Sequence, residues 1–225
     1  MSSPRDIDAS RFAAEALAQD DPTGWFEPLY AAAADGTAIV PWDVPEANPV
    51  LVSWSEGISG AGRSALVVGC GLGRDAEYIA SLGFRVVAFD ISETAISTAR
   101  QRFPESSVEY IVADLLNPPA GWTGAFDLVV ESITVQSMPL SVRAEATGYI
   151  ARMVAPAGEL VVISGIRAED EQVDGPPWPL TRSEVEAFAV DGLRAVEVEQ
   201  VSAAELSNQC RWRAIFRRHR NAVAG

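Results

Sequence analysis

The sequence predicts an α/β fold: a doubly wound, mostly parallel sheet of seven strands with an antiparallel strand at its C-terminal edge. Short apolar runs alternate with helical stretches between residues 64 and 165, which is typical of β-α-β units. Several of these runs end directly in a glycine or an acidic residue, as strands do where their carboxyl ends form a site. After residue 190, two strand-like runs follow one another without a clear helix between them, and these predict an antiparallel pair.

The N-terminal part of the chain is expected to be helical. Prolines 41, 45 and 49 argue against a regular helix in the segment that contains them. We therefore expect one domain with an N-terminal helical segment, residues 1–60, and an α/β part, residues 61–225. The helices of the first segment are expected over residues 9–19, 23–35 and 48–56.

The α/β part alternates strands and helices in the order that right-handed crossovers require. Leu82-Gly83 is a helix-ending signal, and Ser92 can cap the helix after it. Thr181-Arg182-Ser183-Glu184 forms a capping box that begins a short helix reaching about residue 189. The strands are expected over residues 64–68, 85–89, 108–112, 126–130, 159–165, 194–201 and 210–217, and the longer helices over 74–81, 92–103 and 141–154.

The charge balance excludes several classes of partner. The chain has 31 acidic and 17 basic residues, a net charge of −14 and a pI near 4.4. Nucleic-acid binding depends on cationic surface, so we expect no nucleic-acid partner. No apolar run reaches the roughly 18 residues that a membrane span needs, and the N-terminus lacks the apolar core of a signal peptide. We expect a cytoplasmic protein with no membrane partner.

Two residue types are nearly absent. The chain contains no lysine, which excludes a P-loop, Schiff-base chemistry and the Tyr-x-x-x-Lys dehydrogenases. The only histidine, His219, lies near the C-terminus, which argues against Ser-His-Asp or Cys-His catalysis and against a histidine metal site. Cys70 and Cys210 lack metal-ligand spacing, so we expect free, buried thiols and no metal.

A glycine-rich loop carries the strongest functional signal. Gly69-Cys70-Gly71-Leu72-Gly73 lies between a predicted strand and a predicted helix, where backbone can approach a ligand closely. Asp90 lies 21 residues beyond Gly69, at the end of the next strand. A carboxylate at that place can accept both hydroxyls of a ribose. The combination indicates a cofactor that contains a nucleoside.

The loop also resembles a dinucleotide motif, because Gly71 to Ala76 formally fits G-x-G-x-x-A. Read from Gly69, which directly follows the strand, the sixth position is Arg74 rather than glycine or alanine. Asp75 then places a carboxylate near the start of the helix, which suits a zwitterionic amino-acid group better than phosphates. A nicotinamide-dependent reductase and a non-catalytic cofactor-binding protein stay open as alternatives.

Five segments together resemble the class I S-adenosylmethionine-dependent methyltransferases. They are VVGCGLGRD (67–75), VVAFD (86–90), VADL (112–115), FDLVVES (126–132) and PLSVRAEATGYIARMVAPAGELVVIS (139–164). Upstream, the chain resembles the thiopurine, thiol and halide methyltransferase group. The residues that carry this second likeness are Trp25-Phe26, Tyr30, Pro41-Trp42-Asp43, Asn48-Pro49 and the segment 176–181.

The resemblance implies a Rossmann-like class I fold with an N-terminal helical lid, S-adenosyl-L-methionine as methyl donor and S-adenosyl-L-homocysteine as product. It implies that Gly69, Gly71 and Gly73 line the methionine part of the donor. It also implies that Trp42 closes the lid over the donor.

The resemblance assigns further residues to the nucleoside part. Asp90 binds the ribose, with Ile91 packed on the adenine. Asp114 accepts a hydrogen bond from the adenine amino group, with Leu115 beside it. Glu131 and Ser132, which we count among the donor-binding residues, face the donor methyl group and the substrate.

The acceptor implied by the resemblance is a small molecule with a soft nucleophile of the thiol, thiopurine or halide type. A thiol has a pKa of about 8.5 and supplies thiolate near neutral pH without a base. The alternative is an O- or N-methyltransferase of a small metabolite, for which Glu131 or Asp43 is the candidate base. No catalytic residue is assigned.

Overall fold

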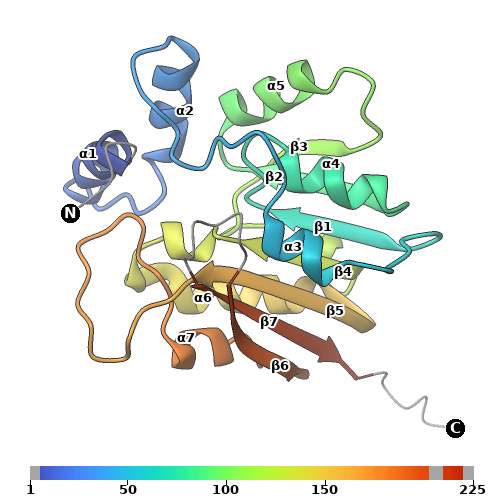
Figure 1. The fold of residues 1–225 in the computed structure, drawn as a ribbon. Coiled ribbons are helices and arrows are strands. Elements are labelled where there is room, and N and C mark those ends of the chain that lie inside the picture. Colours follow the sequence, from blue (N-terminus) through green and yellow to red (C-terminus); the bar gives the residue numbers. More distant parts are fainter. Residues whose placement is uncertain (1–5, 203–209, 220–225) are drawn as a thin grey trace, which may run out of the picture.

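The computed structural model describes residues 6–202 and 210–219, and its centre is a seven-stranded sheet (Figure 1). The strand order is β3-β2-β1-β4-β5-β7-β6. Strands from β3 to β5 pair in parallel, whereas β7 pairs antiparallel with β5 and with β6. The predicted fold class is confirmed, and β6 is the outermost strand of the antiparallel pair. The strands are β1 (Ser64–Val68), β2 (Arg85–Asp90), β3 (Glu109–Val112), β4 (Phe126–Ser132), β5 (Val154–Gly165), β6 (Leu193–Ser202) and β7 (Cys210–Arg218).

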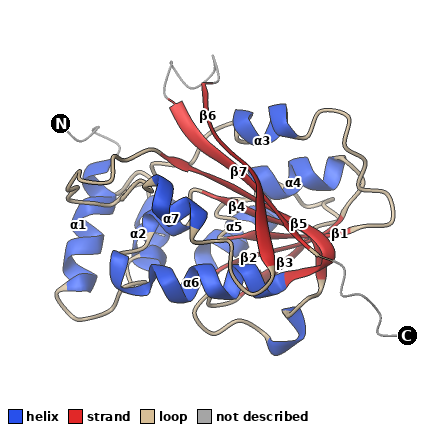
Figure 2. Cartoon of the chain, turned by 90° about the horizontal axis from the view of Figure 1, so that it is seen from below, coloured by secondary structure: helices blue, strands red, loops and turns tan. Residues whose placement is uncertain are grey.

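Helices cover both faces of the sheet (Figure 2). On one face, α4 and α5 bury short apolar side chains such as Ala76, Ile79 and Ile96 against β1 and β2. On the other face, α6 and α7 bury Ile150 and Val185. The helices are α1 (Asp6–Leu17), α2 (Phe26–Ala34), α3 (Pro49–Trp54), α4 (Arg74–Ser81), α5 (Glu93–Arg102), α6 (Leu140–Met153) and α7 (Arg182–Glu186), with 3₁₀ turns η1 (Ala120–Trp122) and η2 (Val135–Ser137).

The N-terminal helices lie at one edge of the sheet. Figure 1 shows α1 and α2 beside the ends toward which β1 and β5 run. The two helices share a small apolar cluster that includes Trp25, Leu29 and Ala95 of α5. In contrast, α3 buries Val50 and Leu51 in the core of the sheet. The division of the chain at residue 60 stays a prediction.

Local signals determine most element ends. The hydroxyl of Ser92 accepts a hydrogen bond from the Ala95 N–H and caps α5, and Thr181 with Glu184 forms the predicted capping box of α7. β1 and α4 have the predicted bounds. β4 ends two residues later than predicted, and β5 begins at Val154 because Phe126 pairs with Val154 across an irregularity. Pairing between distant segments sets these two ends.

Two further findings concern the whole described part of the chain. Within residues 6–202 and 210–219, no helix is long and apolar enough to cross a membrane. Both cysteines are free thiols. The expectation that both are buried was wrong: Cys70 is only half-buried, and Cys210 is exposed because it begins β7 at the margin of the sheet.

Candidate active site

The site lies where the sheet changes direction. From β1 the chain proceeds outward through β2 to β3, then returns to β4 on the other side of β1. In α/β sheets, ligands bind at such a switch point, outside the carboxyl ends of the strands. The register places Val68 beside both Phe89 and Glu131, so the residues that follow these strands meet at one edge.

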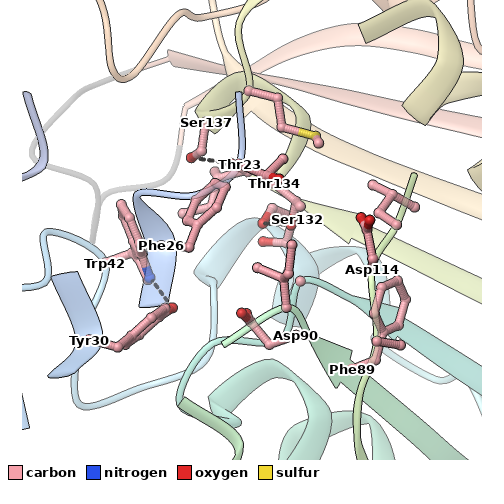
Figure 3. Close-up of a pocket in the computed structure, with 16 residues that line it drawn as sticks. Thr23, Phe26, Tyr30, Trp42, Phe89, Asp90, Asp114, Ser132, Thr134 and Ser137 are labelled. Atoms are coloured by element: carbon pink, nitrogen blue, oxygen red, sulfur yellow. Dashed lines mark hydrogen bonds between the residues drawn. The ribbon is translucent and has the colours of Figure 1, made fainter. Parts of the chain in front are cut away.

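Two adjoining cavities open at this edge. The first, of about 70 Å³, is called here the aspartate cavity because Asp90 and Asp114 line it (Figure 3). The second, of about 330 Å³, is called the glycine-loop cavity because residues 69–72 line it. The two cavities share five lining residues, Trp42, Gly69, Ser132, Ile133 and Ser137.

Asp90 is buried and holds the glycine loop in place. Its Oδ2 accepts a hydrogen bond from the Gly71 N–H at 2.9 Å, and its Oδ1 accepts one from the Ser92 N–H at 3.0 Å. Burial raises the pKa of Asp90 to about 6, against the lowering effect of these backbone donors. Each carboxylate oxygen keeps a second lone pair that a ligand hydroxyl can use.

The aspartate cavity combines acceptors with apolar surface. Asp114 is half-buried, and its Oδ1 accepts the Leu116 N–H at 2.8 Å. Phe89, Ile91 and Leu115 supply apolar lining. Carboxylates that can accept from hydroxyl and amino groups, set among flat apolar surfaces, fit the ribose and adenine of S-adenosylmethionine.

Trp42 and Tyr30 close the cavities on the side of the N-terminal helices. The Trp42 indole N–H donates to the Tyr30 hydroxyl at 2.6 Å (Figure 3). Gly71 has a φ of +50°, and a Cβ on it would lie 2.8 Å from that hydroxyl. Only glycine allows the loop and the aromatic pair to approach this closely.

Two predicted ligand residues lie outside both cavities. Gly73 is the N-cap of α4 with a φ of +90°, and its open side is occupied by the Tyr110 hydroxyl. Glu131 is fully buried, and its Oε1 accepts the Val135 N–H at 2.8 Å, which holds the loop after β4. Burial raises the pKa of Glu131 to about 7, although backbone donors and Arg143 lower it. The donor-binding roles assigned to both residues stay predictions.

Similarity to known proteins agrees with this geometry. The model of the family "Thiopurine S-methyltransferase (TPMT)" matches residues 36–223, which is most of the chain. The chain belongs to the thiopurine S-methyltransferase family. It is an S-adenosylmethionine-dependent methyltransferase with a class I fold, so the predicted family, cofactor and enzyme class are confirmed.

Curated relatives and solved structures agree with this membership. A probable thiol methyltransferase 2 of Arabidopsis thaliana is 28% identical over 85% of this chain and 83% of the relative. Thiocyanate methyltransferase 1 of the same plant is 30% identical over 72% of each chain. The N-methyltransferase NodS of Bradyrhizobium japonicum WM9, solved with S-adenosyl-L-homocysteine, shares the fold with a TM-score of 0.66, at 21% identity over 85% of this chain and 98% of NodS.

The N-terminal segment of this methyltransferase is anchored on α5. The Glu27 carboxylate accepts hydrogen bonds from the hydroxyls of Ser92 at 2.5 Å and Thr94 at 2.6 Å, and from the Thr94 N–H at 3.1 Å. The Asp43 carboxylate forms a bidentate ion pair with Arg102 at 2.7 and 2.8 Å. These contacts hold Trp42, the neighbour of Asp43, over the cavities.

A second anchored segment contributes to the wall of the glycine-loop cavity. Pro176 and Pro177 line that cavity from the segment before α7. Glu184 accepts from the Arg143 Nη1 and from the Arg167 Nη2, each at 2.8 Å. Arg143 also donates to the Trp178 carbonyl, and Arg167 donates to the Pro179 carbonyl at 3.0 Å. One glutamate thus ties both arginines to the backbone of the proline segment.

Sequence reasoning missed several lining residues of the methyltransferase. Ile133 has a φ of +57°, an uncommon conformation for a β-branched residue, and it lies at the junction of the two cavities. Its place directly after the β4 motif was the available signal. Thr23 and Arg211 belong to no motif, and only the tertiary structure brings them to the cavities.

Within the described residues, no cluster of histidine, cysteine or acidic residues could hold a metal ion.

Proposed function

We propose that this enzyme transfers the methyl group of S-adenosylmethionine to a soft nucleophile of a small molecule, of the thiol, thiocyanate or thiopurine type. The observation that carries the proposal is the match of the family model over residues 36–223. The names of the thiol and thiocyanate methyltransferases among its relatives support the choice of acceptor. The proposal includes a small-molecule acceptor and no nucleic-acid partner. It also includes a cytoplasmic location, because both cysteines are free thiols.

The aspartate cavity would hold the nucleoside part of the donor. Asp90 would accept from the ribose hydroxyls, and Asp114 from the adenine amino group, with Ile91 and Leu115 against the ring. The donor supplies a sulfonium-activated methyl group. The glycine loop, with Gly69 and Gly71, would run beside the methionine part.

The junction of the cavities supports an acceptor that needs no base. The five residues shared by both cavities carry no side chain that titrates near neutral pH: Trp42, Gly69, Ser132, Ile133 and Ser137. A thiol near neutral pH already contains a few per cent of thiolate, and thiocyanate is an anion. The chain therefore has to orient the nucleophile in line with the methyl–sulfur bond and exclude water.

Orientation can supply about 7–11 kcal/mol of barrier lowering in favourable cases. Trp42, Phe26 and Met138 line the cavities with apolar surface that displaces water. The anchored lid covers the same side, and it must open for product to leave.

The experiment that tests the proposal has two stages. Binding of S-adenosylhomocysteine is measured by calorimetry for the wild type, for Asp90→Ala and for Tyr149→Phe, a variant on α6 as control. We expect binding by the wild type and the control, and a clear loss of affinity for Asp90→Ala with the fold intact. Turnover is then measured by mass spectrometry with small thiols, thiocyanate, iodide, a thiopurine, a phenol and an amine.

Methylated products from the sulfur or halide acceptors, with no product from the phenol and the amine, are the expected result. Transfer to the phenol or amine alone would replace the proposal with the O- or N-methyltransferase alternative. Tight donor binding with no turnover on any acceptor would favour a non-catalytic cofactor-binding protein.

A further inference from the structure

A buried glutamine in the glycine-loop cavity has no role in the function proposed so far. Gln136 is the middle residue of η2 and is only 9% exposed, and it lines that cavity but not the aspartate cavity. Its side-chain Oε1 accepts the Gly165 N–H, and its backbone carbonyl accepts the Trp178 N–H at 2.7 Å. Both oxygens of Gln136 are therefore occupied by contacts within the fold.

The amide nitrogen of Gln136 is the group left for a ligand. Since an N–H donor must meet an oxygen, the Gly165 N–H determines which end of the carboxamide faces the protein. Among the described residues, the Gln136 Nε2 has no hydrogen-bond partner, and protein atoms do not enclose it completely. A ligand that displaces water from this cavity must offer the Nε2 an acceptor atom, because an unpaired donor costs free energy.

Three contacts fix the place of this nitrogen. Gly165 at the end of β5 orients the side chain of Gln136, and Trp178 holds its backbone. Glu131 accepts the N–H of Val135, the residue before Gln136, at 2.8 Å and so holds the start of η2. The donor is thus oriented before a ligand binds, as a group that determines specificity has to be.

The strand order places Gln136 on the side of the site that the methyl donor leaves open. The residues proposed to hold the donor follow β1, β2 and β3, whereas Gln136 follows β4 and bonds to the end of β5, on the other side of β1. Ser137, its neighbour in the chain, lies at the junction of the two cavities. Neighbouring Cα atoms are about 3.8 Å apart, so an acceptor whose sulfur lies at the junction can place a second group against Gln136.

We propose that Gln136 is a specificity-determining residue that donates a hydrogen bond to the methyl acceptor. The inference rests on the proposed function and narrows the acceptor to an organic thiol with a hydrogen-bond-accepting oxygen or nitrogen a few bonds from its sulfur. Arg211, whose backbone pairs with Gly165, lines the same cavity and makes this wall favourable for electron-rich groups. Plain alkyl and aryl thiols lack such an atom and would leave the Nε2 unpaired.

The test compares acceptors of equal shape. Acetylthiophenols carry a carbonyl oxygen where isopropylthiophenols carry a methyl group, and the 2-, 3- and 4-substituted pairs vary its distance from the sulfur. Methyl transfer from S-adenosylmethionine is measured by mass spectrometry for each thiol, and kcat and KM are determined. We expect the wild type to have a KM at least about fivefold lower for the acetyl member of one pair.

Two substitutions remove the donor. Gln136→Glu keeps an oxygen for the Gly165 N–H and replaces the amide nitrogen by a second oxygen, whereas Gln136→Leu removes both polar groups. Each should lower kcat/KM for the preferred acetyl thiol by about 5- to 100-fold and for its isopropyl partner by less than about threefold. Comparing each variant with the wild type on the same thiol cancels the difference in thiol pKa between the two acceptors.

Gln200→Glu is the matched control, because it makes the same change of charge at an exposed position of β6. It should leave both acceptors unchanged, and all variants should keep the wild-type affinity for S-adenosylhomocysteine. Equal losses of the Gln136 variants on both members of a pair, or no loss on either, would overturn the inference.

The wild type alone decides the matter if neither Gln136 variant folds. Equal wild-type KM values within all three pairs would overturn the role of Gln136 and leave the proposed function in place. Failure of the wild type to methylate any thiol, thiocyanate or iodide would instead overturn the proposed function, and the inference with it.

Discussion

The Trp42 indole N–H donates to the Tyr30 hydroxyl at 2.6 Å, and this bond joins the loop after α2 to α2 itself directly above Gly71. The two rings meet edge to face, with 6.1 Å between their centroids. Tyr30 is buried and Trp42 is half-buried. The bond therefore fixes the two aromatic side chains against Gly71 of the glycine loop.

Tyr30→Phe should weaken binding of S-adenosylhomocysteine. The substitution keeps the ring but leaves the indole N–H of Trp42 without its acceptor, which costs about 1–2 kcal/mol in a site shielded from water. We expect roughly a 5- to 30-fold loss of affinity by calorimetry. Limited proteolysis before residue 48 should also become faster in the absence of ligand.

Tyr149→Phe serves as the control, because Tyr149 lies on α6 with the Arg152 guanidinium over its ring. It should leave both readouts unchanged. An unchanged affinity of Tyr30→Phe would mean that the bond does not hold the lid in the ligand-bound state.

Glu131→Gln should stabilise the ligand-free protein at pH 8. Burial is the main cause that raises the pKa of Glu131 to about 7 in the folded state, from an ordinary value near 4.5. A carboxyl with a raised pKa in the folded state is most favourable for folding below pH 4.5, where it is protonated in the folded and the unfolded state alike. This contribution to stability is lost as the pH rises through about 7. Glutamine keeps an oxygen for the Val135 N–H without the charge. We expect a gain of about 1–3 kcal/mol in unfolding free energy at pH 8.

The gain should be much smaller at pH 5, where the wild-type side chain is protonated. Urea denaturation at the two pH values measures both quantities. Glu109→Gln, at an exposed position of β3, is the control and should show no such difference. A gain of equal size at pH 5 and pH 8 would contradict the assignment to the charge of Glu131.

Glu184→Gln should destabilise the protein far more than Glu186→Gln, although both lie on α7. Glu184 neutralises Arg143 and Arg167, whose side chains are only 7% and 11% exposed. Removing one partner of a buried ion pair costs about 3–5 kcal/mol. Glu186 pairs with Arg182 on the surface, and such pairs contribute about 0–1 kcal/mol.

Chemical denaturation of the two variants checks this contrast. Acceptor KM should rise in Glu184→Gln, because Pro176 and Pro177 lose their support, while affinity for S-adenosylhomocysteine stays near the wild-type value. Equal stabilities of the two variants would show that the arginines find other partners.

The sequence by itself was sufficient to predict the alternation of strands and helices, because each signal for an element's start or end is local. The glycine run after β1, the serine that caps α5 and the Thr181–Glu184 capping box each act within a few residues. The same is true of the aspartates that end or follow β2 and β3. Parallel pairing brings the carboxyl ends of these strands to one edge, which agrees with the shared site that the family resemblance implied for Asp90 and Asp114.

Tertiary structure alone decided which side chains face the ligand and which serve the fold. Gly73 and Glu131 occupy the predicted motif positions, yet neither lines a cavity: the Tyr110 hydroxyl lies against Gly73, and Glu131 accepts the Val135 N–H inside the core. Asp75 receives its hydrogen bonds from Asn48 and Ser132, which lie far from it in sequence. Local patterns fix backbone geometry within a turn or strand, whereas side-chain direction and desolvation depend on contacts between segments that only the folded chain brings together.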